Sequence, residues 1–262
     1  MANLKFEQLL EAGVHFGHLK RKWNPAMAPY IFDEKKGIHV IDLNKTIVKI
    51  EEAGNALRQI ARSGRKILFV ATKKQAKDIV TDKVVETNMP YITERWPGGM
   101  LTNFKTTRKT IRKMSSIDKM MKDGTADTMS KRERLQMTRQ REKMGKIFGS
   151  VTDMSRLPAA LFIVDIKKEH IALAEARNLG IPVFAMVDTN SNPTDIDFVI
   201  PSNDDATKSI ELIIGDMCEM IKDGLGERKA AKQKADADAQ KEKEAKKEVK
   251  AEADTESVEE KS

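Results

Sequence analysis

Short apolar segments, separated mostly by stretches of helical periodicity, constrain the fold of this chain more than any other feature. Four of them predict strands, at 67–71, 161–165, 183–188 and 198–201. A parallel strand that is buried on both faces reads as a continuous apolar run rather than as an alternating one. Strands that alternate with helices indicate βαβ units. The sequence therefore predicts an α/β fold with a mostly parallel, doubly wound sheet.

Helices are predicted between and after these strands. Apolar residues recur at helical spacing over 47–61 and stop at Gly64, and further helices are expected at 73–87, before Gly180, and at 204–222. The N-terminal part predicts a short helix around Phe6 and two short β runs, at 30–32 and 38–41, joined by the polar turn at 33–37.

Positive charge is concentrated in residues 103–148. The whole chain has a net charge of +7, whereas this segment alone holds 14 Lys and Arg against five acids. Asn103 is a candidate cap for one helix, and Ser130 with Glu133 forms a capping-box pair for a second. The polar turn at 122–127 separates them. We predict an antiparallel helical hairpin inserted into an α/β domain that comprises residues 1–102 and 149–224.

Residues 225–262 form a third compositional region, rich in Ala, Lys and Glu with hardly any apolar side chain. Such a segment cannot bury enough apolar surface to fold alone. We expect this charged tail to be disordered or transiently helical.

Several classes of function are disfavoured by what the sequence lacks. It contains neither a G-x-G-x-x-G nor a G-x-x-x-x-G-K-[ST] motif, and Thr72-Lys73-Lys74-Gln75 follows the strand after which a nucleotide enzyme would place glycines. A single cysteine, Cys218, excludes an intramolecular disulfide and fits a reducing cytosol. No apolar run reaches the length of a membrane span. The N-terminal residues predict an amphipathic helix rather than a signal peptide.

The hairpin cations are the strongest candidates for binding nucleic acid, because few acids stand beside them. Exposed helices usually pair opposite charges, and phosphates would relieve the repulsion by displacing counterions. A solvated charge run is the simpler alternative. A basic loop with an aromatic residue and a second tryptophan before a Gly-Gly pair add two more sites. The candidates are Lys105, Arg108, Lys109, Arg112, Lys113, Arg139, Arg141, Lys143 and Lys146 of the hairpin, Lys20, Arg21, Lys22 and Trp23, and Arg95 with Trp96.

Carboxylates follow the ends of the predicted strands. Asp165 and Asp188 end two strands, and Asp204 and Asp205 begin a helix shortly after another. Because ligands of open α/β sheets bind at the carboxyl ends of the strands, Asp188, Asp204 and Asp205 are candidate ligands of a structural divalent cation. The alternative is that Asp204 or Asp205 caps its helix while Asp188 starts a turn. No cofactor is required by either interpretation.

Two histidines, His15 and His18, stand three residues apart, a spacing that can serve a metal. Zinc needs more ligands than this pair supplies. Packing or hydrogen bonding within a loop is therefore the favoured interpretation.

Several of these segments together resemble one family. They are AGVHFGH at 12–18, WNP at 23–25, GGMLTN at 98–103, VDTN at 187–190 and PSNDDA at 201–206. In this order they are similar to signatures of the bacterial small-subunit ribosomal proteins called S-two, the universal uS-two family. The resemblance covers residues 12–206 and leaves the tail outside.

The resemblance implies a flavodoxin-like α/β domain with a helical hairpin. It also implies a cytoplasmic protein on the solvent side of the small ribosomal subunit, between head and body, in contact with small-subunit ribosomal RNA. Family members are further implicated in docking ribosomal protein S-one, the large messenger-RNA-binding protein.

The sequence thus predicts a structural constituent of the small ribosomal subunit, with ribosomal RNA and neighbouring ribosomal proteins as partners and neither DNA nor a membrane. The hairpin would neutralise phosphates and recognise RNA shape. One alternative is an RNA-binding regulator outside the ribosome. The other is a metal- or nucleotide-dependent enzyme at the aspartate crevice, which would need a phosphate loop or an activated nucleophile.

Overall fold

The computed structural model describes the backbone of residues 4–124 and 129–259, and the side chains up to residue 233. Its larger sheet has five strands, all parallel, in the order β5-β4-β6-β7-β8. In sheet order these are β5 (Tyr91–Ile92), β4 (Ile67–Val70), β6 (Ala160–Val164), β7 (Val183–Val187) and β8 (Phe198–Pro201). Numbered along the chain, this is the 2-1-3-4-5 order of flavodoxin-like folds. The predicted fold class is confirmed.

Both faces of this sheet are buried, as the continuous apolar runs predict. Phe69 and Phe162 pack on one side against α2 (Leu43–Arg62), α3 (Lys74–Val85) and the first part of α7 (Thr207–Glu259). Leu68 and Ile163 point to the opposite side, where the core includes residues of α6 (His170–Asn178) and the base of the hairpin. Side chains of β4, β6 and β7 are buried at every position.

A small antiparallel sheet lies beside the main one and has three strands rather than the two predicted. Its order is β1-β3-β2, from β1 (Phe16–Leu19), β3 (Ile38–Ile41) and β2 (Ile31–Lys35). The turn between β2 and β3 uses Lys36 and Gly37, both with positive φ. β1 was not expected because its FGHL sequence shows no β-type alternation. The N-terminal helix α1 (Phe6–Glu11) is confirmed.

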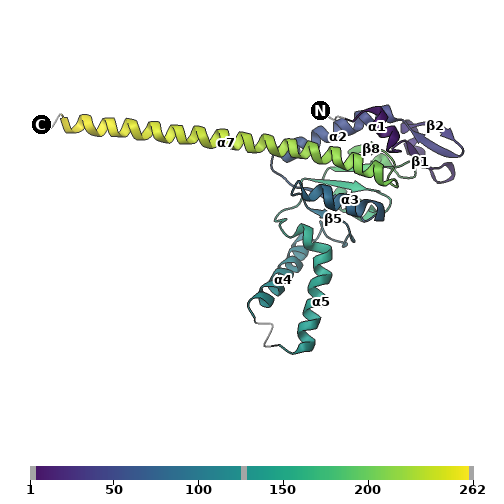
Figure 1. The fold of residues 1–262 in the computed structure, drawn as a ribbon, viewed down its shortest axis with the longest axis horizontal. Helices are drawn as coiled ribbons and strands as arrows, with labels where there is room; N and C mark the ends of the chain where they lie inside the picture. Colours follow the sequence, from purple (N-terminus) through teal and green to yellow (C-terminus); the bar gives the residue numbers. More distant parts are fainter. Residues whose placement is uncertain (1–3, 125–128, 260–262) are drawn as a thin grey trace.

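The basic insert forms a helical hairpin that projects from the sheet (Figure 1). It consists of α4 (Phe104–Lys122) and α5 (Lys131–Phe148), inserted between β5 and β6. Ser130 and Glu133 form the predicted capping box. Asn103 stands at the N-cap of α4, but its side chain makes no capping hydrogen bond, which corrects the prediction. Part of the predicted turn, residues 125–128, lies outside the described residues.

The C-terminal helix differs from its prediction at both ends. It begins at Thr207 rather than Asp204 and continues to Glu259 instead of ending at Lys222 (Figure 1). Ala, Lys and Glu are strong helix formers, so local propensity favours a helical backbone in the tail. Of the two predicted states, the helical one matches this backbone, while the predicted lack of fixed structure stays a prediction. Nowhere in the described part of the chain does a helix have the length and apolar character that crossing a bilayer requires.

Candidate carboxylate cluster and nucleic-acid interface

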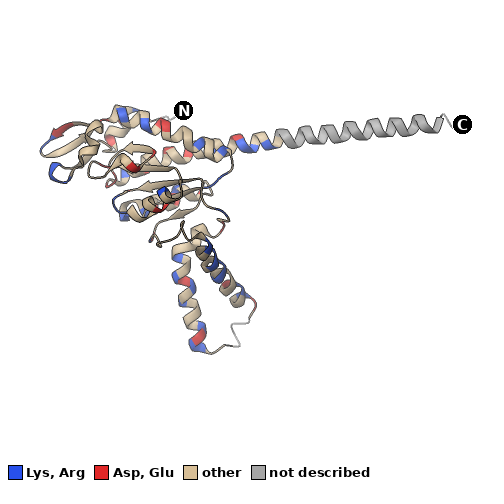
Figure 2. Cartoon of the chain, turned by 180° about the vertical axis from the view of Figure 1, so that it is seen from behind, with Lys and Arg blue, Asp and Glu red and all other residues tan. Residues whose placement is uncertain are grey.

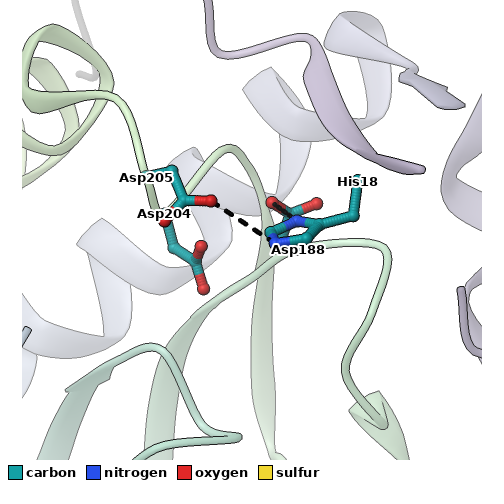
Figure 3. Close-up of side chains that lie close together, drawn as sticks. All are labelled: His18, Asp188, Asp204 and Asp205. Carbon is teal, nitrogen blue, oxygen red and sulfur yellow. Dashed lines mark hydrogen bonds and ion pairs between the residues drawn. The ribbon is translucent and has the colours of Figure 1, made fainter. Parts of the chain in front are cut away.

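The carboxyl edge of the main sheet brings together one histidine and three aspartates (Figure 3). Asp188 follows β7, Asp204 and Asp205 follow β8, and β1 supplies His18. His18 Nδ1 lies 2.7 Å from Asp188 Oδ2, and His18 Nε2 lies 3.4 Å from Asp205 Oδ2. One ligand atom from each residue fits within 4.8 Å of the others. The predicted convergence of the three aspartates is therefore observed.

A partly buried lysine joins the same cluster from the other side. Lys73 follows β4, and its Nζ lies 2.7 Å from Asp204 Oδ1, 2.6 Å from Asp205 Oδ1 and 3.4 Å from Asp165 Oδ2. β4 and β6 flank the point where the strand order reverses, which is where ligands of open α/β sheets bind. In this chain a lysine and an aspartate occupy that place.

Asp204 experiences the strongest electrostatic conflict. Burial, together with the charges of Asp165 and Asp188, raises the pKa of Asp204 to about 7, although Lys73 acts in the opposite direction. Burial alone would lower the pKa of Lys73, but the surrounding carboxylates outweigh it and the net pKa is raised. Asp204 Oδ2 is buried without a hydrogen-bond partner. Negative charge at this edge is therefore only partly compensated by Lys73.

His18 titrates in the same field. Its hydrogen bond to Asp188 is the main cause that raises the pKa of His18, and the charges of Asp188, Asp204 and Asp205 add to it against the effect of burial. His15 is not part of the cluster, and its pKa is lowered by burial and by Lys35. His18 is hydrogen-bonded as predicted, although it lies on strand β1 rather than in a loop.

The capping interpretation of Asp204 and Asp205 is wrong. Asn203 Oδ1 accepts hydrogen bonds from the backbone N–H groups of Asp205 and Ala206, at 2.9 and 3.2 Å. α7 begins later, at Thr207, so neither aspartate occupies its N-cap. The Asn203 side chain thus accepts the turn hydrogen bonds and leaves both carboxylates free to face His18 and Lys73. Asp188 does start a turn, because Ser191 donates to its backbone oxygen at 3.1 Å.

The donor set fits a divalent cation. An imidazole nitrogen with several carboxylate oxygens is a combination that zinc accepts, and a cation would compensate the charge that Lys73 leaves. His18 could offer only one of its ring nitrogens, because the two point to different aspartates.

The hairpin carries its cations on exposed helix faces (Figure 2). On α4 three exposed cations, Lys105, Lys109 and Arg112, stand three, four or seven residues apart, opposite the buried residues of that helix. On α5 Arg139, Lys143 and Lys146 have the same spacing, and Phe148 is the one buried residue of that helix. Seven predicted residues are exposed and make no ion pair within the described part of the chain: Lys105, Lys109, Arg112, Lys113, Arg139, Lys143 and Lys146.

Two predicted hairpin residues already have partners within the protein. Arg141 Nε lies 2.7 Å from Asp118 Oδ1 and pairs α5 with α4. Arg108 Nη1 donates to the backbone oxygen of Ser155 at 3.1 Å. Arg141 therefore contributes to the hairpin's own structure, and Arg108 ties the base of the hairpin to the body.

The basic loop of residues 20–23 lies far from the hairpin, beside the small sheet (Figure 2). Lys20, Arg21 and Lys22 form a short 3-10 helix and are exposed, and Lys20 pairs with Glu34 at 2.7 Å. Trp23 is 37% exposed, and its ring centre lies 5.1 Å from that of His39. More than a third of the Trp23 surface therefore remains accessible.

The third predicted site divides between surface and core. Arg95 is exposed, but Trp96 is only 6% exposed and donates from Nε1 to Glu175 Oε1 at 3.0 Å. A buried indole cannot stack on an RNA base, so the predicted role of Trp96 is corrected. It belongs to the core beneath the hairpin.

Fold and sites together describe a flavodoxin-like domain that carries an exposed cationic hairpin and has no phosphate-binding glycine motif in its sequence. A family model described as Ribosomal protein S2 matches residues 9–224. The chain belongs to this family, as the resemblance of its sequence signatures implies.

Relatives of high identity agree with this assignment. The small ribosomal subunit protein uS2 of Parabacteroides distasonis is 65% identical over 237 residues, covering 90% of this chain and 85% of the relative. The protein of the same name from Azobacteroides pseudotrichonymphae is 68% identical over 228 residues, 87% of each chain. That of Bacteroides fragilis is 63% identical over 232 residues, 88% of this chain and 84% of the relative.

Proposed function

We propose that this chain is a structural, non-enzymatic constituent of the small ribosomal subunit that binds ribosomal RNA through its hairpin. The observation that carries the proposal is the set of seven exposed hairpin cations, named above, that make no ion pair within the described residues. When such cations bind phosphates, they release the counterions condensed on the nucleic acid, which favours binding. The names of the relatives, small ribosomal subunit protein uS2, support a place in the cytoplasmic ribosome.

The test neutralises four exposed hairpin cations together, with Lys109, Arg112, Arg139 and Lys143 each changed to Gln. Binding to small-subunit ribosomal RNA is measured over a range of salt concentrations. Each lost phosphate contact lowers the log–log salt slope by about 0.7 to 0.9, so the slope should fall by roughly three and the affinity by on the order of a hundredfold.

A matched variant separates local contact from net charge. Changing Lys45, Arg62, Arg65 and Lys74 to Gln removes the same charge from exposed positions on α2, α3 and the loop between α2 and β4. Its slope should stay near that of the wild type. Equal slopes for the two variants would disprove a hairpin interface. Sucrose-gradient fractionation then distinguishes the rival RNA-binding regulator, which would sediment away from the small subunit.

A protein partner is expected at a second surface, in keeping with the docking of ribosomal protein S-one that the family resemblance implies. A hollow of about 580 Å³ between α1 and the small sheet is lined by Phe6, Leu10, Phe16 and Phe32, among others. Phe32 is 74% exposed. Contiguous exposed apolar side chains of this kind mark protein contacts. Phe32→Ala should reduce capture of purified S-one, and unchanged capture would exclude this surface.

A structural divalent cation at the His18–aspartate cluster is the second proposal. The observation that favours it is the buried, unpartnered Asp204 Oδ2 beside three other ligand atoms. His18, Asp188, Asp204 and Asp205 would hold the ion, which would neutralise the edge and stiffen the junction between β1 and the main sheet.

A further inference from the structure

Glu175 of α6 makes a concentrated set of hydrogen bonds with the loop that leads into the hairpin. Its Oε1 accepts from Trp96 Nε1 at 3.0 Å and from the backbone N–H of Gly99 at 2.7 Å. Its Oε2 accepts from the backbone N–H groups of Leu101 and Thr102, at 2.9 and 3.1 Å, and from the Thr102 hydroxyl at 3.2 Å. All five donors belong to residues 96–102, between β5 and α4.

The carboxylate is buried and ionised in this position. Glu175 is 7% exposed. Burial would raise its pKa, but the donors from Trp96, Thr102, Leu101 and Gly99 outweigh burial, and the net pKa of Glu175 is lowered. Its charge is therefore stabilised by converging N–H dipoles, an arrangement that holds the loop backbone in one conformation.

The loop matters because the hairpin has few other means of fixing its direction. Its own seam is thin, since α5 buries only Phe148. Contacts with the body are confined to its base, where Ile111 and Phe148 join the core and Arg108 donates to the Ser155 backbone at 3.1 Å. The far part of the hairpin extends away from the body (Figure 1). A small rotation at the base therefore moves the exposed cations over a large distance.

We propose that Glu175 is a positioning residue for RNA binding, which orients the hairpin by fixing residues 96–102 at its entrance. The proposal rests on the RNA-binding function of the hairpin proposed above. Glu175 itself touches no RNA; it acts through the loop and α4. A hairpin held in one direction presents its phosphate contacts together, and a mobile one binds only in the fraction of molecules that are correctly oriented.

Glutamine is the informative replacement because it keeps the shape and removes the second acceptor. One end of its amide would carry an NH2 group facing either the Trp96 and Gly99 donors or those of Leu101 and Thr102. Two donors then oppose each other in a buried place, and the loop must shift.

Glu169, at the N-cap of the same helix, offers a matched control. It is 3% exposed and accepts a hydrogen bond from the backbone N–H of Thr72 at 3.1 Å, away from the hairpin entrance. Glu169→Gln therefore makes the same chemical change in a similarly buried place. Loss of general stability should affect both variants, whereas loss of hairpin orientation should affect only Glu175→Gln.

Hairpin orientation can be measured directly in the full chain by electron spin resonance. Spin labels are attached at Ser116→Cys on α4 and Asn55→Cys on α2, both exposed positions. The native Cys218 is 2% exposed and burial raises the pKa of its thiol to about 12, so it does not compete for the label. The wild type and Glu169→Gln should give one narrow distance distribution, and Glu175→Gln a broad one. A narrow distribution at the wild-type distance in Glu175→Gln would overturn the proposal.

RNA affinity supplies the second readout. Glu175→Gln should weaken binding to small-subunit ribosomal RNA about tenfold, as expected if roughly a tenth of the molecules hold the bound orientation. The salt slope should stay unchanged, because the phosphate-binding side chains remain. If Glu175→Gln binds RNA with unchanged affinity while the four-cation variant shows the expected lower salt slope, the positioning role is refuted and the RNA-binding proposal stands. If Glu175→Gln broadens the distance distribution while the four-cation variant keeps the wild-type salt slope, the RNA-binding proposal is refuted and the orientation of the hairpin by Glu175 stands.

Trp96→Phe keeps the test decisive if Glu175→Gln does not fold. It removes one donor to Oε1 and keeps an aromatic side chain in the core. A smaller broadening and a weaker loss of RNA affinity are expected. Trp23→Phe is the control for the spin-label distance measurement, because Trp23 lies in a loop that Glu175 does not contact. If Trp96→Phe retains the narrow wild-type distribution, the loop does not set the hairpin's direction.

Discussion

The hairpin and the carboxyl edge of the sheet both gather charge, and they handle it in opposite ways. At the edge, Asp204 is buried and faces Lys73 at 2.7 Å, so part of the negative charge is compensated inside the protein. On the hairpin, Lys109 and Arg112 are exposed and have no ion pair within the described residues. A buried charge needs a partner within the fold, whereas an exposed charge is solvated and can pair with a binding partner. The difference supports the proposal that the hairpin is where this protein meets a polyanion.

The largest expected effect comes from comparing the two tryptophans, one of which is buried while the other is exposed. Trp96 is 6% exposed and Trp23 is 37% exposed. Trp96→Ala should lower the free energy of unfolding by about 3 to 5 kcal/mol, because it leaves a cavity in the core. Trp23→Ala should cost less than about 1 kcal/mol in stability. It should instead weaken RNA binding by roughly 1 to 3 kcal/mol if a base stacks on it.

Chemical denaturation of both variants, with RNA binding measured alongside, tests this division of roles. A large loss of stability in Trp23→Ala would mean that this tryptophan packs in the core. Wild-type stability in Trp96→Ala would mean that the second tryptophan does not hold the hairpin base.

Acid should reveal the buried carboxylate of Glu175. Its pKa is lowered in the folded protein, so its contribution to stability is fully present above the unfolded value of about 4.3 and is lost as pH falls through the folded value. Glu175→Gln should therefore cost about 1 to 3 kcal/mol at neutral pH, and the difference from wild type should shrink on acidification. Urea unfolding at several pH values measures it. A difference that grows toward low pH would contradict an ionised Glu175.

Measuring cation binding tests whether an ion compensates the carboxylates at the carboxyl edge of the sheet. Asp188→Asn and Asp205→Asn should each weaken Zn²⁺ binding at least about tenfold in calorimetry, because each removes one charged ligand. Asp78→Asn, an exposed acid of α3, is the control. Affinity should also fall as pH drops below about 7, since protons compete at Asp204, whose pKa is about 7, and at His18, whose pKa is raised. Metal-free protein after dialysis against a zinc salt would mean that Lys73 alone compensates the edge.

The sequence predicted the parts of the molecule whose cause is local. The main strands other than β5, the hairpin helices and the Ser130 capping box all follow from apolar periodicity and short motifs. β5 spans only Tyr91–Ile92, too short for a periodic signal. The convergence of Asp188 with Asp204 also followed, because parallel strands bring their carboxyl ends to one edge.

What the sequence did not reveal depends on tertiary contacts. His18 joins the aspartates only because the unpredicted strand β1 pairs with β3. Lys73 was seen as a departure from glycine-rich loops, and only the fold shows that it neutralises Asp204. The exposure of Trp96 was misjudged because its partner, Glu175, lies 79 residues away in sequence. Lysine directly after a buried strand is a signal that could have pointed to the cluster.

The smallest expected effect is the difference between replacing a paired and an unpaired cation of the hairpin. Arg141 is balanced by Asp118 at 2.7 Å, whereas Lys143, two residues further along α5, is exposed and unpaired within the described chain. Lys143→Gln should lower the log–log salt slope of RNA binding by about 0.7 to 0.9, the value of one phosphate contact. Arg141→Gln should change it less, because Asp118 already balances its charge, so the arginine neutralises less phosphate charge and releases fewer counterions from the RNA. If Arg141→Gln lowers the slope as much as Lys143→Gln, the arginine must leave Asp118 for a phosphate on binding. The hairpin would then rearrange its own ion pair when it meets RNA.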